Sequence, residues 1–312
     1  MKKNYFLAVL FTFAMVSVNA QFTDDMESYT DGQPISGGHW TDWGCGGGAG
    51  CAIMSSSAQA HGGSLSGYVP DDTTTDAVLD LGNKIFGTWG LSFWAYVPSG
   101  KEGYYNLQGT VPIGPGEWIV GNIYFNKDNA NPGVGEIDDS ALGVVNFNFP
   151  HDEWFYVAMN VDISAGIGAS TWEFGVNGNV AIPAGTAFTD NAGTYPTSLG
   201  GLDLFSINAN HQMWYDDFTY QDSFVSMDPP LGVNDLAAKG FAAYPNPVSN
   251  ILNLKANEAI TSVAIFNILG QEVYNAKVNA VSSTVDMSSY ASGAYFVKVN
   301  IGGTEGIVKV VK

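Results

Sequence analysis

The sequence contains no arginine and is poor in other basic residues. Eleven lysines stand against 30 aspartates and glutamates, so the 312-residue chain has a net charge of −19 at pH 7. A chain this acidic is repelled by nucleic acid and by anionic lipid, so we expect neither as a partner. Neutral sugars, cations and basic surfaces remain as ligands, although acidity also serves simply to keep a protein soluble.

Cysteine is almost as scarce. Cys45 and Cys51 are the only two, and they flank a glycine-rich interval in "WGCGGGAGC". Because glycine lets the chain bend sharply, we expect them to close a small disulfide loop, which stabilises the fold by roughly 2–3 kcal/mol. A metal site is the less favoured alternative, since no nearby histidine or cysteine completes a ligand set.

Several catalytic patterns are missing as well. No Gly-x-Ser-x-Gly elbow and no phosphate-binding loop occur. The histidines are widely scattered, without the His-x-x-x-His spacing typical of zinc sites. We interpret each as a surface or hydrogen-bonded strand residue: His39, His61, His151 and His211.

Long apolar runs are absent after residue 20. Before it, Lys2 and Lys3 precede "FLAVLFTFAMVSV", which ends at the small-x-small site Val18-Asn19-Ala20. This pattern predicts a secretory signal peptide over residues 1–20, because the run is too short for a stable membrane span. We expect the mature chain to begin at Gln21 without a transmembrane segment.

Alternating apolar residues dominate the rest of the chain. The segments 91–98, 118–126, 142–149, 154–163 and 202–209 are rich in aromatic and β-branched residues at period two. Asn177-Gly178 lies between two alternating flanks, which is a strong hairpin signal. The pattern predicts an all-β protein whose first part is a sandwich or barrel.

A domain boundary is expected near "SMDPPLGVNDLAAKG". Residues 21–238 hold three lysines against 26 acids, whereas residues 239–312 hold six lysines against four acids. All eight tryptophans precede residue 215, and Pro229-Pro230 cannot continue a strand ladder. We therefore predict a first domain over 21–225, a linker over 226–240 and a small sandwich of about seven strands over 241–312.

The second domain resembles the type A C-terminal sorting domain of the type IX secretion system. The matching stretches are "YPNPVSN", "IFNILGQEV", "SGAYFVKV" and the terminal "KVVK", in the order of that family. The resemblance implies that the domain is read by the secretion translocon and its sortase, and that the protein is secreted or anchored at the outer cell surface. The residues that carry it are Tyr244, Pro245, Asn246, Pro247, Gly270, Gly293, Tyr295, Lys309 and Lys312. The alternative is an immunoglobulin-like accessory module with no targeting role.

The first domain resembles concanavalin A-like (laminin G-like) jelly rolls. The features that match are "FTDDMESYTDG", "HGGSLSG", "WGLSFWAYVPSGKEGYYNLQG" and "MWYDDFTY". The resemblance implies that the first and last strands pair with each other. Many such modules hold structural calcium between these strands, so we expect a calcium site at Asp25, Glu27, Asp216 and Asp217. Acidic residues at strand edges also discourage aggregation without binding any ion.

The stretch "GEIDDSAL" resembles the Glu-x-Asp-x-Glu strand of jelly-roll β-glucan hydrolases. Glu136 and Asp138 match its first two acids, but Ser140 stands where the acid/base belongs. Retaining glycosidases need two carboxyl groups about 5–5.5 Å apart, one of which protonates the leaving group. We therefore name no catalytic residue and interpret the stretch as a solvated acidic hairpin.

Tryptophan faces can stack on sugar rings. Trp40 and Trp43 lie in the polar, glycine-rich "GGHWTDWGCGGG", where exposure is plausible, whereas Trp94, Trp154, Trp172 and Trp214 lie within alternating strands and are expected in the core. The leading hypothesis is that the jelly roll binds a carbohydrate or another extracellular surface through Trp40 and Trp43. The alternatives are a polysaccharide-degrading hydrolase or lyase and a protein-binding adhesin.

Overall fold

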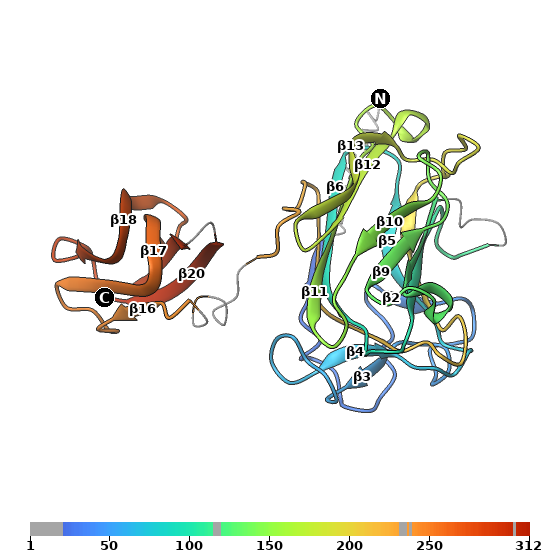
Figure 1. Cartoon of the computed structure of the whole chain (residues 1–312), viewed down its shortest axis with the longest axis horizontal. Helices are drawn as coiled ribbons and strands as arrows, with labels where there is room; N and C mark the ends of the chain where they lie inside the picture. Colours follow the sequence, from blue (N-terminus) through green and yellow to red (C-terminus); the bar gives the residue numbers. More distant parts are fainter. Residues whose placement is uncertain (1–20, 115–119, 231–235, 237–238, 302–303) are drawn as a thin grey trace, which may run out of the picture. The chain divides into compact units, whose positions relative to one another are not determined.

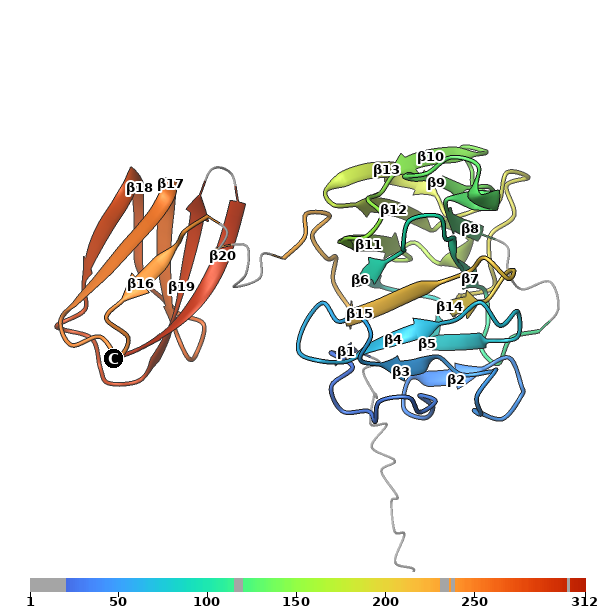
Figure 2. The ribbon, with the colours of Figure 1, turned by 60° about the horizontal axis from the view of Figure 1, so that its bottom comes forward.

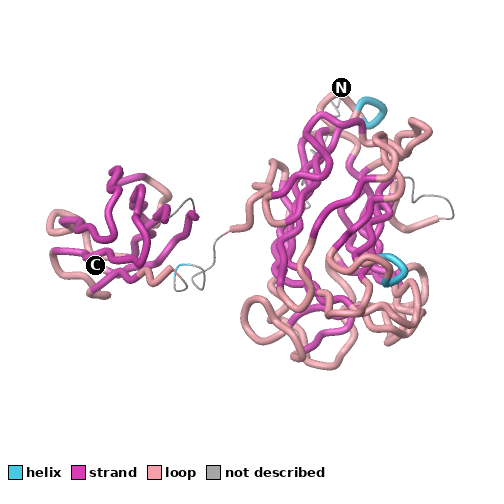
Figure 3. The backbone as a smooth tube through the Cα atoms, in the orientation of Figure 1, coloured by secondary structure: helices cyan, strands magenta, loops and turns pink. Residues whose placement is uncertain are grey.

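The computed structural model describes residues 21–114, 120–230, 236, 239–301 and 304–312 (Figure 1). The chain forms two compact units, Met1–Asp228 and Pro229–Lys312. Strands dominate both units, with very little helix (Figure 3). No helix among these residues is long and apolar enough to span a membrane. The predicted signal peptide, residues 1–20, lies outside the described residues.

The N-terminal unit is a sandwich of two sheets, visible as two layers in Figure 1. The eight-stranded sheet, here called the back sheet, has the order β13-β12-β11-β6-β15-β4-β3, with β1 also paired to β15. The seven-stranded sheet, here called the front sheet, has the order β10-β9-β8-β7-β14-β5-β2. The antiparallel pairing of β1 with β15 joins the first strand to the last, as the resemblance to jelly rolls implied.

The back sheet contains β1 (Phe22–Asp24), β3 (Met54–Ser56), β4 (Ser66–Val69), β6 (Thr88–Tyr96), β11 (Trp154–Asp162), β12 (Thr171–Val176), β13 (Asn179–Ala187) and β15 (Met213–Gln221). The front sheet contains β2 (Trp40–Asp42), β5 (Asp76–Lys84), β7 (Gly103–Gln108), β8 (Val120–Phe125), β9 (Val134–Ile137), β10 (Val145–Asn148) and β14 (Leu199–Phe205). Two short 3₁₀ turns, η1 (Lys127–Asn129) and η2 (Ile167–Ala169), lie in connections.

The two sheets bury one apolar core between them. In β5 the core side chains are Ala77, Leu79 and Leu81, and in β7 they are Tyr105 and Leu107. Successive side chains of a strand point to opposite faces, so the intervening residues of the front sheet must face away from the core. The all-β class predicted from the alternation is confirmed, as is the jelly-roll sandwich that the resemblance implied.

The Asn177-Gly178 hairpin is also confirmed. Val176 of β12 pairs with Asn179 of β13, and both turn residues have positive φ, 49° and 79°. This conformation is accessible to asparagine and glycine at low cost.

The expected burial of tryptophans in the core was only partly right. Trp172 belongs to the core cluster and Trp214 is also buried, as expected, but Trp94 and Trp154 are only half-buried. Trp94 stacks on His61 with ring centroids 3.8 Å apart, and Trp154 packs against Tyr96. A period-two pattern does not reveal which of its two faces is the core when both faces carry aromatic residues.

The C-terminal unit is one antiparallel sheet that closes around its own core. Its strands are β16 (Ala242–Tyr244), β17 (Ile251–Asn267), β18 (Glu272–Asp286), β19 (Ala294–Ile301) and β20 (Thr304–Val311) (Figure 2). Its described residues form five strands instead of the expected seven or so, because β17 and β18 continue through register shifts that bend them. Leu252, Ile265 and Val297 are fully buried at the centre.

Candidate functional site

A row of side chains crosses the outer face of the front sheet. Strand register pairs Asn146 of β10 with Glu136 of β9, Glu136 with Tyr124 of β8, and Tyr124 with Tyr104 of β7. At the other end, Phe205 of β14 pairs with Asp76 of β5, whose carbonyl accepts a hydrogen bond from the Trp43 N–H at 3.2 Å. The row is the set Trp43, Asp76, Phe205, Tyr104, Tyr124, Glu136 and Asn146.

A second row, made of amides and carboxyl groups, runs beside the first. Asn106 pairs in register with Asn122 on one side and with Asp203 on the other. Its Nδ2 donates to Asp203 Oδ2 at 2.9 Å and to the Tyr104 hydroxyl at 3.0 Å. The Tyr104 hydroxyl donates to Asn122 Oδ1 at 2.8 Å. This network fixes the orientation of the aromatic rings above it.

The two rows line a hollow in the sheet. Its volume is about 420 Å³, and its walls combine aromatic faces with polar groups, as in typical small-molecule sites. The lining residues are Trp43, Asp76, Tyr104, Asn106, Asn122, Tyr124, Asp203 and Phe205. The ring centroids of Tyr104 and Tyr124 lie 4.9 Å apart with their planes tilted by 52°, so the two rings form an angled aromatic platform.

Two interacting carboxyl groups lie in this hollow. Burial and the nearby charge of Asp76 raise the pKa of Asp203 well above its ordinary value. Burial likewise raises the pKa of Asp76. Like charges at close range disfavour double ionisation, so ionisation of one carboxyl group opposes ionisation of the other. Within the described part of the protein, Oδ1 of each carboxyl group is buried without a hydrogen-bond partner.

Glu136 and Asp138 form an ion-paired cluster at the other end of the row. Lys127 Nζ lies 2.5 Å from Glu136 Oε1 and 3.3 Å from Asp138 Oδ2, and it lies 4.3 Å from the ring centroid of Tyr124. The stretch lies in the β9–β10 hairpin, as interpreted from the sequence, but Glu136 and Asp138 are half-buried in ion pairs with Lys127 instead of being freely solvated. Ser140 instead closes the following turn, donating to the Gly143 carbonyl at 2.8 Å.

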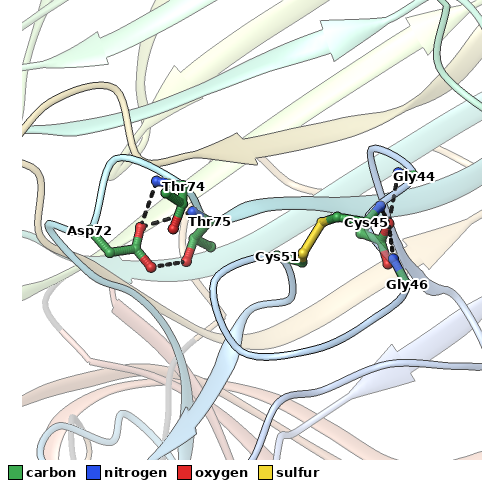
Figure 4. Close-up of a disulfide and its surroundings, with 8 residues drawn as sticks. Gly44, Cys45, Gly46, Cys51, Asp72, Thr74 and Thr75 are labelled. Carbon is green, nitrogen blue, oxygen red and sulfur yellow. Dashed lines mark hydrogen bonds between the residues drawn. A yellow bond between two sulfur atoms is a disulfide. The ribbon is translucent and has the colours of Figure 1, made fainter.

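The disulfide loop holds Trp43 at the edge of the hollow. The predicted Cys45–Cys51 bond is present. Asp42 Oδ1 accepts hydrogen bonds from three backbone N–H groups at the start of the loop, among them Cys45 at 2.6 Å (Figure 4). At its end, the Cys51 carbonyl accepts a hydrogen bond from the Asp76 N–H at 3.0 Å. The loop is therefore bonded to β5 beside the hollow.

The prediction that Trp40 forms an exposed platform with Trp43 was wrong. Trp40 is 2% exposed, and its indole donates to Asp24 Oδ2 at 2.8 Å. Trp43 is half-buried and lines the hollow, which is compatible with its predicted ligand-binding role. The two side chains diverge because residues an odd number apart in an extended chain point to opposite faces.

Three of the four predicted calcium ligands, Glu27, Asp216 and Asp217, converge on the glycine-rich loop of residues 61–65. Glu27 accepts hydrogen bonds from the N–H groups of Ser64 and Leu65, at 2.8 and 2.7 Å. Asp216 is fully buried and accepts one from the His61 N–H at 2.8 Å, while Asp217 Oδ2 lies 2.6 Å from His61 Nδ1.

The contacts of Glu27, Asp216 and Asp217 with residues 61–65 are here called the clasp. Asp25 takes no part in it and accepts a hydrogen bond from the Glu27 N–H. Burial raises the pKa of Asp216 to about 7 despite its hydrogen bonds. Nowhere in the described ranges do three or more His, Cys, Asp or Glu side chains gather as a metal site would require. Calcium binding stays a prediction.

Three of the predicted sorting motifs meet in the C-terminal unit. Asn246 of "YPNPVSN" accepts a hydrogen bond from the Val311 N–H at 2.9 Å and donates to the Lys309 carbonyl at 3.2 Å. Gly293 and Lys312 exchange two backbone hydrogen bonds. Tyr295 is buried nearby, with its hydroxyl donating to the Ala291 carbonyl.

The remaining sorting residues lie elsewhere. Gly270, with φ of 73°, forms the turn between β17 and β18. Tyr244 ends β16, and Pro245 and Pro247 follow it in the connection to β17.

Most of the front-sheet site was missed at the level of sequence. Asp76 and Asp203 lie in separate alternating segments that read as ordinary strands. One sequence feature could have indicated the site. Asn106 in "YYNLQ" and Asn122 in "GNIYF" occupy strand positions where asparagine is uncommon.

Comparison with known proteins gives one family match and several distant likenesses. Residues 242–312 match the secretion system C-terminal sorting domain. Beta-agarase A of Zobellia galactanivorans is 25% identical over 268 residues, which cover 77% of this chain and 45% of that protein. The chain thus spans less than half the length of this relative.

Two solved structures show distant similarity. The catalytic domain of a glycoside hydrolase family 131 protein from Coprinopsis cinerea is 12% identical, covering 53% of this chain and 73% of that one, with a TM-score of 0.33. A tandem CBM22 domain from Paenibacillus barcinonensis is 8% identical over 93% and 84%, with a TM-score of 0.31. Scores this low carry no argument about function.

The family match and the convergence of its motifs agree. Export to the cell surface or beyond follows from the presence of such a domain, as does interaction with the secretion machinery. Residues 242–312 are a type IX secretion C-terminal sorting domain, and the N-terminal sandwich is the part of the chain that it exports.

Proposed function

We propose that the N-terminal unit binds a carbohydrate on the outer face of its front sheet. The observation that carries this proposal is that the first row, which contains four aromatic side chains, runs beside the second row of amides and carboxyl groups across several strands. Sugar rings present apolar faces that stack on aromatic side chains and hydroxyl groups that hydrogen-bond to amides and carboxylates. The partial likeness to beta-agarase A supports a carbohydrate ligand without naming it.

The polar side chains that line the hollow support the same proposal. Hydroxyl groups of a sugar stacked on the aromatic rings would meet amide and carboxyl groups beside them, among them Asn122 and Asp76. Exclusion of water by a stacked ring strengthens such hydrogen bonds.

A glycan array followed by calorimetry tests the proposal. Tyr124→Ala removes half of the aromatic platform, and we expect it to weaken binding about tenfold, equivalent to about 1.4 kcal/mol. Trp154→Ala is the matched control, because Trp154 is a half-buried aromatic residue of the back sheet. Equal losses in both variants, or no glycan bound by the wild type, would contradict the proposal.

A second candidate is hydrolysis or lysis of a polysaccharide. The specific observation in its favour is the carboxyl pair of Asp76 and Asp203, whose raised pKa values suit a group that donates a proton at neutral pH. Release of reducing ends or unsaturated products that is lost in Asp203→Asn would establish this activity. If the protein binds a polysaccharide but releases no product, the proposed binding function stands and the enzymatic one is refuted.

A further inference from the structure

Among the described residues, one lysine lies beside the two rows of the front sheet. The N-terminal unit beyond residue 20 has only three lysines and no arginine. Lys84 ends β5, but its ammonium lies over the ring of Trp89 in β6, and Lys101 pairs with Asp71 after β4. Only Lys127 lies beside the two rows, against Tyr124.

The ammonium group of Lys127 is already ion-paired within the protein. Lys127 Nζ contacts the carboxylates of both Glu136 and Asp138, and its side chain is 33% exposed. Two carboxylates around one ammonium leave the cluster with a net charge of −1. Asp76 and Asp203 add further negative charge at the other end of the rows. An anionic ligand would therefore meet repulsion along the whole face, without a free cation to bind it.

We propose that the glycan held on the front sheet carries no sulfate or carboxylate groups, and that Glu136 and Asp138 exclude anionic glycans by neutralising Lys127. This inference rests on the proposed carbohydrate-binding function. It assigns to "GEIDD" a role in specificity in place of the catalytic role of the glucanase motif that it resembles. Discrimination arises here from a repulsive element as well as from attractive contacts.

The test uses one neutral galactan oligosaccharide and its chemically sulfated form. We expect the wild type to bind the sulfated form at least tenfold more weakly than the neutral one at low ionic strength. The double variant Glu136→Gln/Asp138→Asn frees Lys127, and we expect it to reduce this ratio to within about threefold. The readout is the ratio of the two affinities, so a general loss of binding does not mimic the effect.

The matched control is Glu153→Gln/Asp222→Asn, which changes the net charge by the same amount at exposed positions next to back-sheet strands β11 and β15. Its affinity ratio should equal that of the wild type. Sulfated galactan binding as tightly as the neutral form would overturn the inference while leaving the proposed function intact. An equal change of ratio in both double variants would overturn the role of Lys127. Absence of binding to every glycan on an array would instead refute the proposed function itself.

Discussion

Asp24 is a heavily hydrogen-bonded, buried carboxylate in β1. It accepts hydrogen bonds from the Met26 N–H, the Tyr29 hydroxyl and the Trp40 indole, and it lies 2.8 Å from His39 Nε2. Burial alone would raise its pKa, but hydrogen bonds, first from His39 and then from Trp40 and Tyr29, lower that pKa to about 2. The ionised side chain anchors the first strand to the segment around β2.

This depressed pKa predicts a specific acid sensitivity. A carboxylate with a lowered folded-state pKa stabilises the fold above its unfolded pKa of about 3.9, by about 2 kcal/mol here, and the contribution is lost as pH falls through about 2. Asp24→Asn should therefore lower the free energy of unfolding at pH 7 by about 2 kcal/mol and flatten its dependence on pH between 5 and 2. Urea denaturation across this range measures both, and an unchanged acid slope would contradict the assignment.

The pH dependence of stability expected from Asp203 is opposite to that expected from Asp24. Its raised folded-state pKa means that it stabilises the fold below its unfolded pKa and loses this contribution as pH rises through the folded pKa. Asp203→Asn removes the charge while keeping an acceptor for Asn106. We expect the melting temperature of the variant to rise relative to wild type between pH 5 and pH 8, while glycan affinity falls. A variant that is less stable than wild type at pH 8 would show that the charged form is the native one.

The disulfide loop is the element that positions Trp43. Because the loop is hydrogen-bonded to β5 at both Trp43 and Cys51, opening it should loosen the edge of the hollow. We expect Cys45→Ser/Cys51→Ser to reduce stability by roughly 2–3 kcal/mol and glycan affinity several-fold. Calorimetry under non-reducing conditions measures the affinity. Affinity equal to that of the wild type would show that the loop does not position the tryptophan.

The clasp on residues 61–65 is the element where calcium is predicted. If an ion links Glu27 to Asp216, excess EDTA should lower the melting temperature in calcium-free buffer, and added calcium should restore it. The clasp is otherwise held by backbone N–H donors, and EDTA would then have no effect. Thermal denaturation at pH 8 with and without EDTA distinguishes these outcomes.

Strand positions were predictable from the sequence, but the faces of the strands were less so. The alternation of "WGLSFWAY" predicts a strand without revealing that Phe93 faces the core and Trp94 the outside. Trp40 and Trp43 lie in the same polar, glycine-rich stretch of sequence. The pairing of β2 with β5 determines that Trp40 is buried whereas Trp43 lines the hollow. Asp76 and Asp203 are far apart in the chain, so no local pattern relates them.

At the scale of the whole molecule, the sorting domain was the most predictable part. Its motifs are short and ordered in sequence, and the structure brings "YPNPVSN" and "KVVK" together through Asn246. The register of long bent strands was not predictable, because β17 and β18 depend on contacts along their full length.

The sorting domain gives a prediction for export. Deletion of residues 242–312 should retain the N-terminal unit in the periplasm, because the translocon then has no signal to read. Asn246→Ala should reduce export by loosening the contact with the last strand. Cell fractionation with immunodetection measures both. Surface export of the deletion variant at the normal level would refute the role of the domain.

On the proposed function, a glycan chain lies along the row that crosses the front sheet. Seven strands about 4.8 Å apart make this row roughly 29 Å long, which accommodates several sugar units. One end is the hollow beside Trp43, and the other is a second hollow of about 290 Å³ lined by Glu136 and Asn146.

The most direct measurement is the affinity of the wild type, Trp43→Ala and Asn146→Ala for a series of oligosaccharides of increasing length. We predict that wild-type affinity rises with length until both hollows are filled, and that each variant removes the gain that the longer oligosaccharides provide. A shortest oligosaccharide that binds as tightly as the longest, with neither variant weakening the interaction, would contradict the account.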